Sequence, residues 1–130
     1  MNIKPNLQFS VLCDDVRRED NGKFMLIGIF EAINAKNFPA THPALFVMNR
    51  WCKGEGSFTQ KIRITNSKDK KMVFQTEDQP FTLEDIDRHH TLISKFNNLV
   101  FTDAGKYWLE VFLDKELVLN YPIILKEVKQ

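Results

Sequence analysis

This 130-residue chain contains no long apolar run, no Cys-x-x-Cys pair and no marked excess of one charge. No apolar stretch approaches the roughly 18 residues of a membrane-spanning helix, and residues 1–6 contain no apolar core of signal-peptide length. We therefore expect a cytoplasmic protein without an integral membrane segment. Eighteen basic residues against 17 acidic ones give a net charge of +1, which argues against a dedicated nucleic-acid-binding protein.

Cysteine is scarce, since Cys13 and Cys52 are the only two and neither lies in a Cys-x-x-Cys pair. Disulfides are rare in the cytoplasm, so we expect both to be free thiols, although export would leave a Cys13–Cys52 bridge open. Asp14 and Asp15 follow Cys13, and their charge disfavours the thiolate that a nucleophile needs. Nucleophile-elbow, P-loop and dinucleotide-binding glycine patterns are absent as well. We therefore predict that the chain is not an enzyme and uses no cofactor.

Phenylalanine is abundant, with 11 residues, and short alternating apolar segments recur at intervals typical of an all-β fold. About seven to nine strands predict an antiparallel, immunoglobulin-like β-sandwich in one domain spanning 1–130. The expected strands are 7–13, 24–30, 44–52, 57–65, 72–76, 90–96, 99–101, 106–113 and 117–125. Residues 24–30 are apolar at both odd-numbered and even-numbered positions, which predicts a central strand covered on both faces. Residues 32–43 are expected to be a connection, and 77–88 an irregular acidic region with a helical turn at 82–85.

The most informative segment runs from Asp103 to Tyr107 and leads into the alternating positions 107, 109, 111 and 113. A turn, a glycine and a tyrosine two residues before a core position are typical of the tyrosine corner of immunoglobulin-like domains. The tyrosine hydroxyl in such a corner bonds to nearby backbone. Leu109 stands where a disulfide-forming cysteine would be, so packing is expected to hold this core together.

If those positions face inward, Trp108, Glu110 and Phe112 face outward on the same strand. Exposed aromatic residues mark contact surfaces, so this face is our candidate interface, with Trp51 either joining it or packing in the core. Burial of the aromatic pair under neighbouring loops is the alternative. Lys61 and Arg63 also share an outer face, and with Arg50 beside them they would form a modest basic patch for phosphate or an acidic partner.

Acidic residues form the weaker candidate site. Carboxylates gathered at one end of a sandwich bind calcium, and the candidates are Asp14, Asp15, Asp78, Asp85 and Asp87. Solvated loop carboxylates are the simpler interpretation, because no calcium-loop motif is present. The adjacent His89 and His90 point to opposite faces of a strand, so they cannot chelate one metal together.

Several segments together resemble a family of small, uncharacterised bacterial proteins classed as a domain of unknown function. These segments are Leu12-Cys-Asp-Asp-Val-Arg17, Asn21-Gly-Lys-Phe24, Ile27-Gly-Ile-Phe30, Phe38-Pro-Ala40, Phe46-Val-Met-Asn-Arg-Trp51 and Gly105-Lys-Tyr107, with Glu110 and Leu113-Asp114. The resemblance implies a compact β-sandwich over nearly the whole chain, and it implies no activity.

The sequence thus favours a non-catalytic module that binds a protein or small ligand. Self-association as a homodimer through the Trp108/Phe112 face is one form that this binding could take. One alternative is a domain that binds calcium or anionic lipid through the acidic loops. The other is an unrecognised hydrolase built around His89 or His90.

Overall fold

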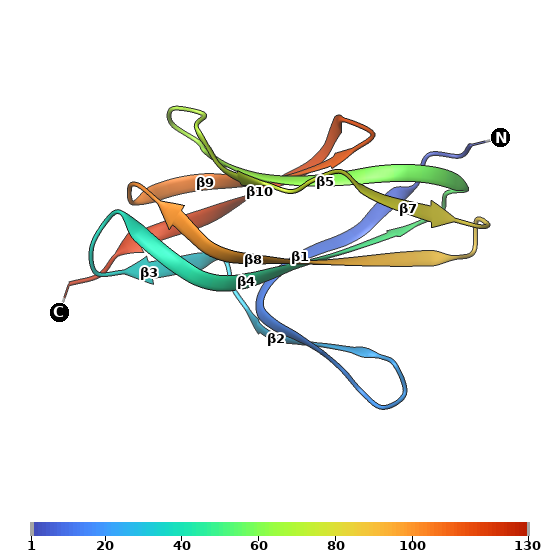
Figure 1. Cartoon of the computed structure of the whole chain (residues 1–130), viewed down its shortest axis with the longest axis horizontal. Coiled ribbons are helices and arrows are strands. Elements are labelled where there is room, and N and C mark those ends of the chain that lie inside the picture. Colours follow the sequence, from blue (N-terminus) through green and yellow to red (C-terminus); the bar gives the residue numbers. More distant parts are fainter. Residues whose placement is uncertain (1, 130) are drawn as a thin grey trace.

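The computed structural model describes residues 2–129, and all regular structure within them is β-strand (Figure 1). Alternating apolar and polar residues and the scarcity of helical periodicity explain this outcome. The elements are β1 (Asn6–Arg18), β2 (Phe24–Ile29), β3 (Ala32–Ala35), β4 (Ala40–Cys52), β5 (Gly56–Asn66), β6 (Met72–Gln75), β7 (Gln79–Leu83), β8 (His89–Phe101), β9 (Gly105–Leu113) and β10 (Glu116–Glu127). The described residues therefore hold ten strands rather than seven to nine. They contain no helix long and apolar enough to cross a membrane.

The strands form two sheets that lie one above the other (Figure 1). The four-stranded sheet has the order β2-β1-β4-β8 and is strongly curled. The six-stranded sheet has the order β3-β10-β9-β5-β6, and β7 pairs with another part of β5. All pairings are antiparallel except that of β3 with β10, so the expectation of a purely antiparallel fold is wrong at this edge.

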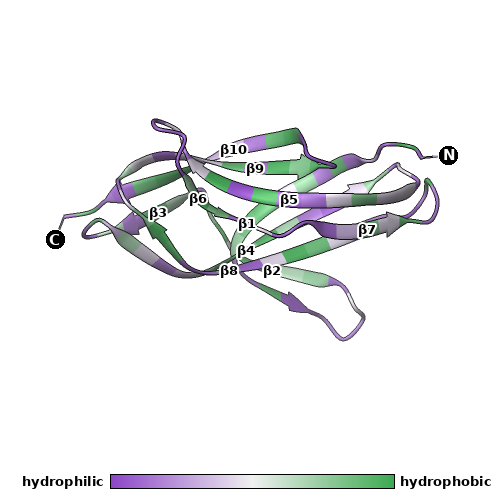
Figure 2. Cartoon of the chain, turned by 45° about the horizontal axis from the view of Figure 1, so that its top comes forward, coloured by the Kyte–Doolittle hydropathy of each residue, from purple (hydrophilic) through white to green (hydrophobic). Residues whose placement is uncertain are grey.

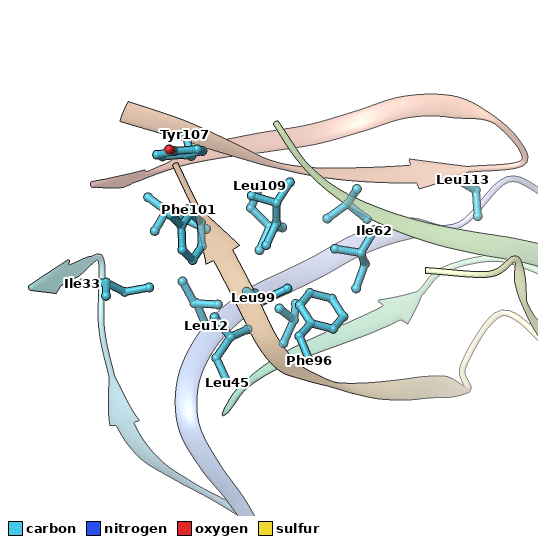
Figure 3. Packing of buried hydrophobic residues seen from close by; sticks show 14 of the residues in the cluster. Leu12, Ile33, Leu45, Ile62, Phe96, Leu99, Phe101, Tyr107, Leu109 and Leu113 are labelled. Carbon is cyan, nitrogen blue, oxygen red and sulfur yellow. The ribbon is translucent and has the colours of Figure 1, made fainter. Parts of the chain in front are cut away.

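One hydrophobic core fills the space between the sheets (Figure 3). On β9, Tyr107, Leu109, Val111 and Leu113 are all buried, as the alternation predicts. On β5, Phe58, Ile62 and Ile64 likewise face the core. Colouring by hydropathy shows the same alternation of apolar and polar positions along the strands (Figure 2). The core-facing side of β5 and of β9 was therefore predictable from the sequence.

The predicted tyrosine corner is present at the start of β9. The Tyr107 hydroxyl donates a hydrogen bond to the Asp103 carbonyl oxygen over 2.8 Å, and the ring is 1% exposed. The Phe101 ring meets it edge-on, with 5.0 Å between the ring centres. The corner thus ties the turn before β9 to the core.

β2 contradicts the prediction of a central strand covered on both faces. It is the terminal strand of the four-stranded sheet and pairs only with β1 among the described residues. Met25, Ile27 and Ile29 are exposed. A strand that is apolar at odd and even positions alike has the same sequence pattern at the edge of a sheet as in its interior, so the pattern does not distinguish the two.

The connection expected at 32–43 contains two strands instead. Residues 32–35 form β3, and β4 begins at Ala40, so Pro43 lies inside a strand. At that point β4 pairs only with β8, since its pairing with β1 begins at Phe46. A proline is tolerated there because one side of the strand needs no ladder hydrogen bonds.

The acidic region and the two strands expected after it are also different. β7 occupies Gln79–Leu83 and pairs with β5 through residues 56–60, which replaces the expected irregular segment and helical turn. β8 runs without interruption from His89 to Phe101, although 90–96 and 99–101 were expected as separate strands. Asn98 has a φ of +54°, so the strand continues through one left-handed residue.

Both cysteines are buried free thiols. Cys13 pairs across the sheet with Phe46, and Cys52 lies six residues further along β4. At about 3.3 Å per residue the two sites are roughly 20 Å apart, far beyond the reach of a disulfide. Burial is the main cause that raises the pKa of the Cys13 thiol, and the charges of Asp14 and Asp15 raise it further.

Candidate interaction surface

The outer face of the six-stranded sheet carries Trp108, Glu110 and Phe112, which are half-exposed on β9 as the alternation predicts. Their neighbours across the sheet are Thr65, Arg63 and Lys61 on β5. Aromatic and charged side chains are therefore interleaved on two adjacent strands. We call this surface, made of Lys61, Arg63, Thr65, Trp108, Glu110 and Phe112, the β5–β9 face.

Cations cover both aromatic rings of this face. The Lys106 ammonium lies 4.7 Å from the centre of the Trp108 ring, and the Arg63 guanidinium lies 4.7 Å from the centre of the Phe112 ring. Arg63 Nε also donates to Glu110 Oε1 over 3.0 Å. The rings are thus held in fixed positions by cation–π contacts rather than forming a bare apolar patch.

A small cleft of about 140 Å³ lies beside Phe112 on the same face. Its charged lining consists of Lys61, Arg63 and Lys115 against the single carboxylate of Asp78. Asp78 is 3.4 Å from Lys61, whereas Lys115 has no ion-pair partner among residues 2–129. Because Arg63 pairs with Glu110, the cleft combines an aromatic wall with one positive charge, that of Lys115, that has no ion-pair partner within residues 2–129.

Trp51 does not belong to this surface. It is fully buried on β4 and stacks on Phe81 with 5.6 Å between ring centres. Its Nε1 donates to Gln60 Oε1 over 2.7 Å. Of the two positions that the sequence left open for Trp51, the structure shows the core.

Arg50 does not extend the basic patch either. It lies on β4 in the other sheet, where its guanidinium stands over Phe9 and Nε donates to Thr91 Oγ1 over 2.9 Å. Lys61 and Arg63 do share one face of β5, as expected. The basic character of the β5–β9 face therefore comes from Lys61 and Arg63 on β5, from Lys106 on β9 and from Lys115.

The acidic candidates are dispersed rather than gathered at one end. Asp14 and Asp15 lie near the far end of β1, whereas Asp85 and Asp87 lie in the turn between β7 and β8, beside the other end of the four-stranded sheet. A hydrogen bond from Arg17 is the main cause that lowers the pKa of Asp15. Asp85 is 3.5 Å from Arg88 and Asp78 pairs with Lys61. Within residues 2–129 no three His, Cys, Asp or Glu side chains are placed to share a metal ion.

Within residues 2–129 the two adjacent histidines form no metal-binding group with these carboxylates. His89 is exposed at the start of β8, and His90 lies on the opposite face with its ring 5.4 Å from Phe81. Neither has a hydrogen bond to a carboxylate among the described residues.

A buried chain of polar side chains was missed from the sequence. Gln60 Oε1 accepts from Trp51 Nε1 and from Asn49 Nδ2 (3.0 Å), and Gln60 Nε2 donates to Gln79 Oε1 (2.9 Å). Gln79 Nε2 in turn donates to Ser94 Oγ over 2.9 Å. The chain links both sheets through the core. Gln60 alternates along β5 with the inward-facing residues Phe58 and Ile62. Its place in the sequence therefore indicated that a polar side chain faces the core.

Comparison with known proteins gives one assignment. A search of curated proteins finds no match to the chain. A family model described as a family of unknown function, DUF6941, matches residues 8–126, which is nearly the whole sequence and confirms the resemblance seen in its turn and strand segments. The chain therefore belongs to the family of unknown function DUF6941.

Proposed function

We propose that this chain is a non-catalytic binding module whose contact surface is the β5–β9 face and whose partner is an acidic protein segment. The observation that carries the proposal is the cleft beside Phe112, where three cations and one carboxylate surround an aromatic wall. Aromatic residues and arginine are the side chains most enriched where binding energy is concentrated. Positive charge around them favours a negatively charged partner.

The charge of this face also favours a foreign partner over a second copy. Two copies meeting cleft to cleft would bring two surfaces of the same positive charge together. Like charges across an interface cost free energy and slow association. We therefore assign the β5–β9 face to an acidic partner and not to the self-association expected from the aromatic pair.

The test is an NMR titration with a capped peptide of alternating glutamate and leucine. We expect the amide signals around Arg63, Phe112 and Lys115 to shift, and we expect the shifts to weaken as salt is added. Lys115→Glu should abolish them, because it replaces a cation of the cleft with a carboxylate. The fold should be unaffected, since Lys115 is exposed and forms no ion pair within residues 2–129. Lys95→Glu is the matched control, since Lys95 stands over Phe46 on the outer face of the other sheet.

Three results would contradict the proposal. The first is no shift at millimolar peptide. The second is an equal response to a peptide with lysine in place of glutamate, and the third is an equal loss with Lys95→Glu. Any of these would mean that the charge of the cleft does not recognise an acidic partner.

We also propose that the two sheets form an immunoglobulin-like sandwich. The Tyr107 corner at the start of β9 supports this, as does the order β10-β9-β5-β6, which parallels the G-F-C-C′ order of variable-type domains. The order β1-β4-β8 parallels A-B-E in the same way. A crystal structure would test the proposal, and a different order of these strands would refute it.

A further inference from the structure

β2 presents an unprotected sheet edge. It is the last strand of the four-stranded sheet, and the β1–β2 hairpin projects away from the two layered sheets (Figure 1). Its sequence, Phe24-Met-Leu-Ile-Gly-Ile29, contains neither a charged residue nor a proline. Exposed edges usually carry such residues because a free row of backbone N–H and C=O groups pairs readily with another strand.

The exposed side chains of this edge are large and apolar. Met25, Ile27 and Ile29 are 43%, 40% and 67% exposed. They alternate along β2 with Phe24 and Leu26, which instead line a hollow of about 470 Å³ together with residues of β1 and β4. Their partners on β1 are likewise every second residue, so the register places the three exposed side chains on one face of the strand, although Gly28 has a φ of +69°.

The charges that flank β2 are arranged symmetrically about its centre. Lys23 precedes Ile27 by four residues and Glu31 follows it by four. Both are exposed, and neither forms an ion pair within residues 2–129. Phe30 N–H still donates to the Leu12 carbonyl oxygen, so the extended course of β2 continues to the residue before Glu31.

We propose that β2 pairs antiparallel with β2 of a second copy, about a two-fold axis at Ile27. In this register Lys23 of each copy lies opposite Glu31 of the other, and Met25 lies opposite Ile29. Leu26 comes opposite Gly28, so a branched side chain meets a position without one. The two four-stranded sheets would then form one continuous sheet across the axis.

Only an antiparallel second copy brings the opposite charges of Lys23 and Glu31 together. A parallel arrangement in register would put Lys23 against Lys23 and Glu31 against Glu31, and like charges directly opposite each other destabilise a strand pair. A partner chain of other sequence would have to supply both opposite charges at the same spacing. The strand supplies them to itself only when it runs antiparallel about Ile27.

The first test traps the two-fold contact with a disulfide. Ile27→Cys places two thiols opposite each other on the axis, at a Cβ separation compatible with a disulfide. The native cysteines are both buried, so the introduced thiol is the accessible one. Ile93→Cys is the matched control, because Ile93 is 39% exposed on β8, the other edge of the same sheet. Under mild oxidation we expect a covalent dimer from Ile27→Cys at a rate well above that of the control.

The second test measures mass by sedimentation equilibrium. The wild type should approach twice 15.2 kDa at high concentration, Ile27→Lys should remain at 15.2 kDa, and Ile93→Lys should behave as the wild type. Lys23→Glu and Glu31→Lys should each weaken the dimer roughly tenfold, because each creates two like-charge contacts, and the double reversal should restore it. Circular dichroism confirms that each variant is folded.

Either of two outcomes overturns the proposal. One is a wild type that stays monomeric at all soluble concentrations while the two cysteine variants cross-link equally. The other is a dimer that survives Ile27→Lys, or whose charge reversals do not rescue each other. Lys115→Glu, which tests the β5–β9 face, should leave the mass unchanged, so the two proposals fail independently.

Discussion

Replacing Gln60 with leucine tests whether the buried polar chain holds the two sheets together. Gln60 is fully buried, and its side-chain oxygen accepts from Trp51 Nε1 and Asn49 Nδ2, which are also fully buried. Leucine leaves both donors without this acceptor. A buried polar group without a partner costs about 1–3 kcal/mol, and leucine recovers roughly 1 kcal/mol through its apolar surface.

The expected loss in the free energy of unfolding is therefore about 3 kcal/mol, or a fall of about 10 °C in Tm for a chain of this length. Urea unfolding followed by circular dichroism measures it. The cost should shrink by about 1–2 kcal/mol when Gln60→Leu is made in a Trp51→Phe background, because the Trp51 donor is then absent. A loss below 1 kcal/mol, or equal losses in both backgrounds, would refute the reasoning.

Three further predictions concern single side chains. Tyr107→Phe removes the two hydrogen bonds that the hydroxyl makes with the Asp103 backbone and keeps the packing, so the free energy of unfolding should fall by about 1–2 kcal/mol in urea unfolding. Burial raises the pKa of Tyr121 from 10.0 to about 12. Between these pH values the unfolded chain loses the proton and the folded one keeps it, so stability should fall by about 1.4 kcal/mol per pH unit, and Tyr121→Phe should remove this part of the pH dependence. Gly28→Ala should lower Tm more than Gly22→Ala, because both have positive φ but a Cβ at Gly28 would also collide with the Asp14 carboxylate.

Strands with one face in the core and one face in solvent were predictable. β5 and β9 each have one face in the core and the other toward solvent, so apolar residues are expected at every second position and their orientation follows from sequence. The tyrosine corner was predictable for a similar reason, since its hydrogen bond joins Tyr107 to a residue only four positions away. Local patterns therefore identified the β5–β9 face.

Features decided by distant contacts were not predictable. β7 exists because Gln79–Leu83 pairs with residues 56–60 of β5, and nothing within its own five residues requires that pairing. β3 is a strand because it lies parallel to the last four residues of β10. The cleft beside Phe112 depends on Lys115 and Asp78, which reach it from the β9–β10 turn and the segment before β7. Sequence reasoning found the aromatic residues but not these partners.

The prediction of a covered central strand at β2 is wrong for the single chain, but the apolar pattern behind it still has a physical consequence. The run from Phe24 to Ile29 is apolar at odd-numbered and even-numbered positions alike. Such a run is unfavourable at a solvent-exposed edge and suits a strand covered on both faces. In the single chain, Phe24 and Leu26 face the hollow beside β1 and β4, while Met25, Ile27 and Ile29 stay exposed. Pairing with a second copy would partly cover those three side chains and satisfy the free backbone edge. In the dimer β2 would then have a neighbouring strand at each edge, although it would still not be covered on both faces as the sequence predicts, and the free edge would be a property of the isolated chain alone.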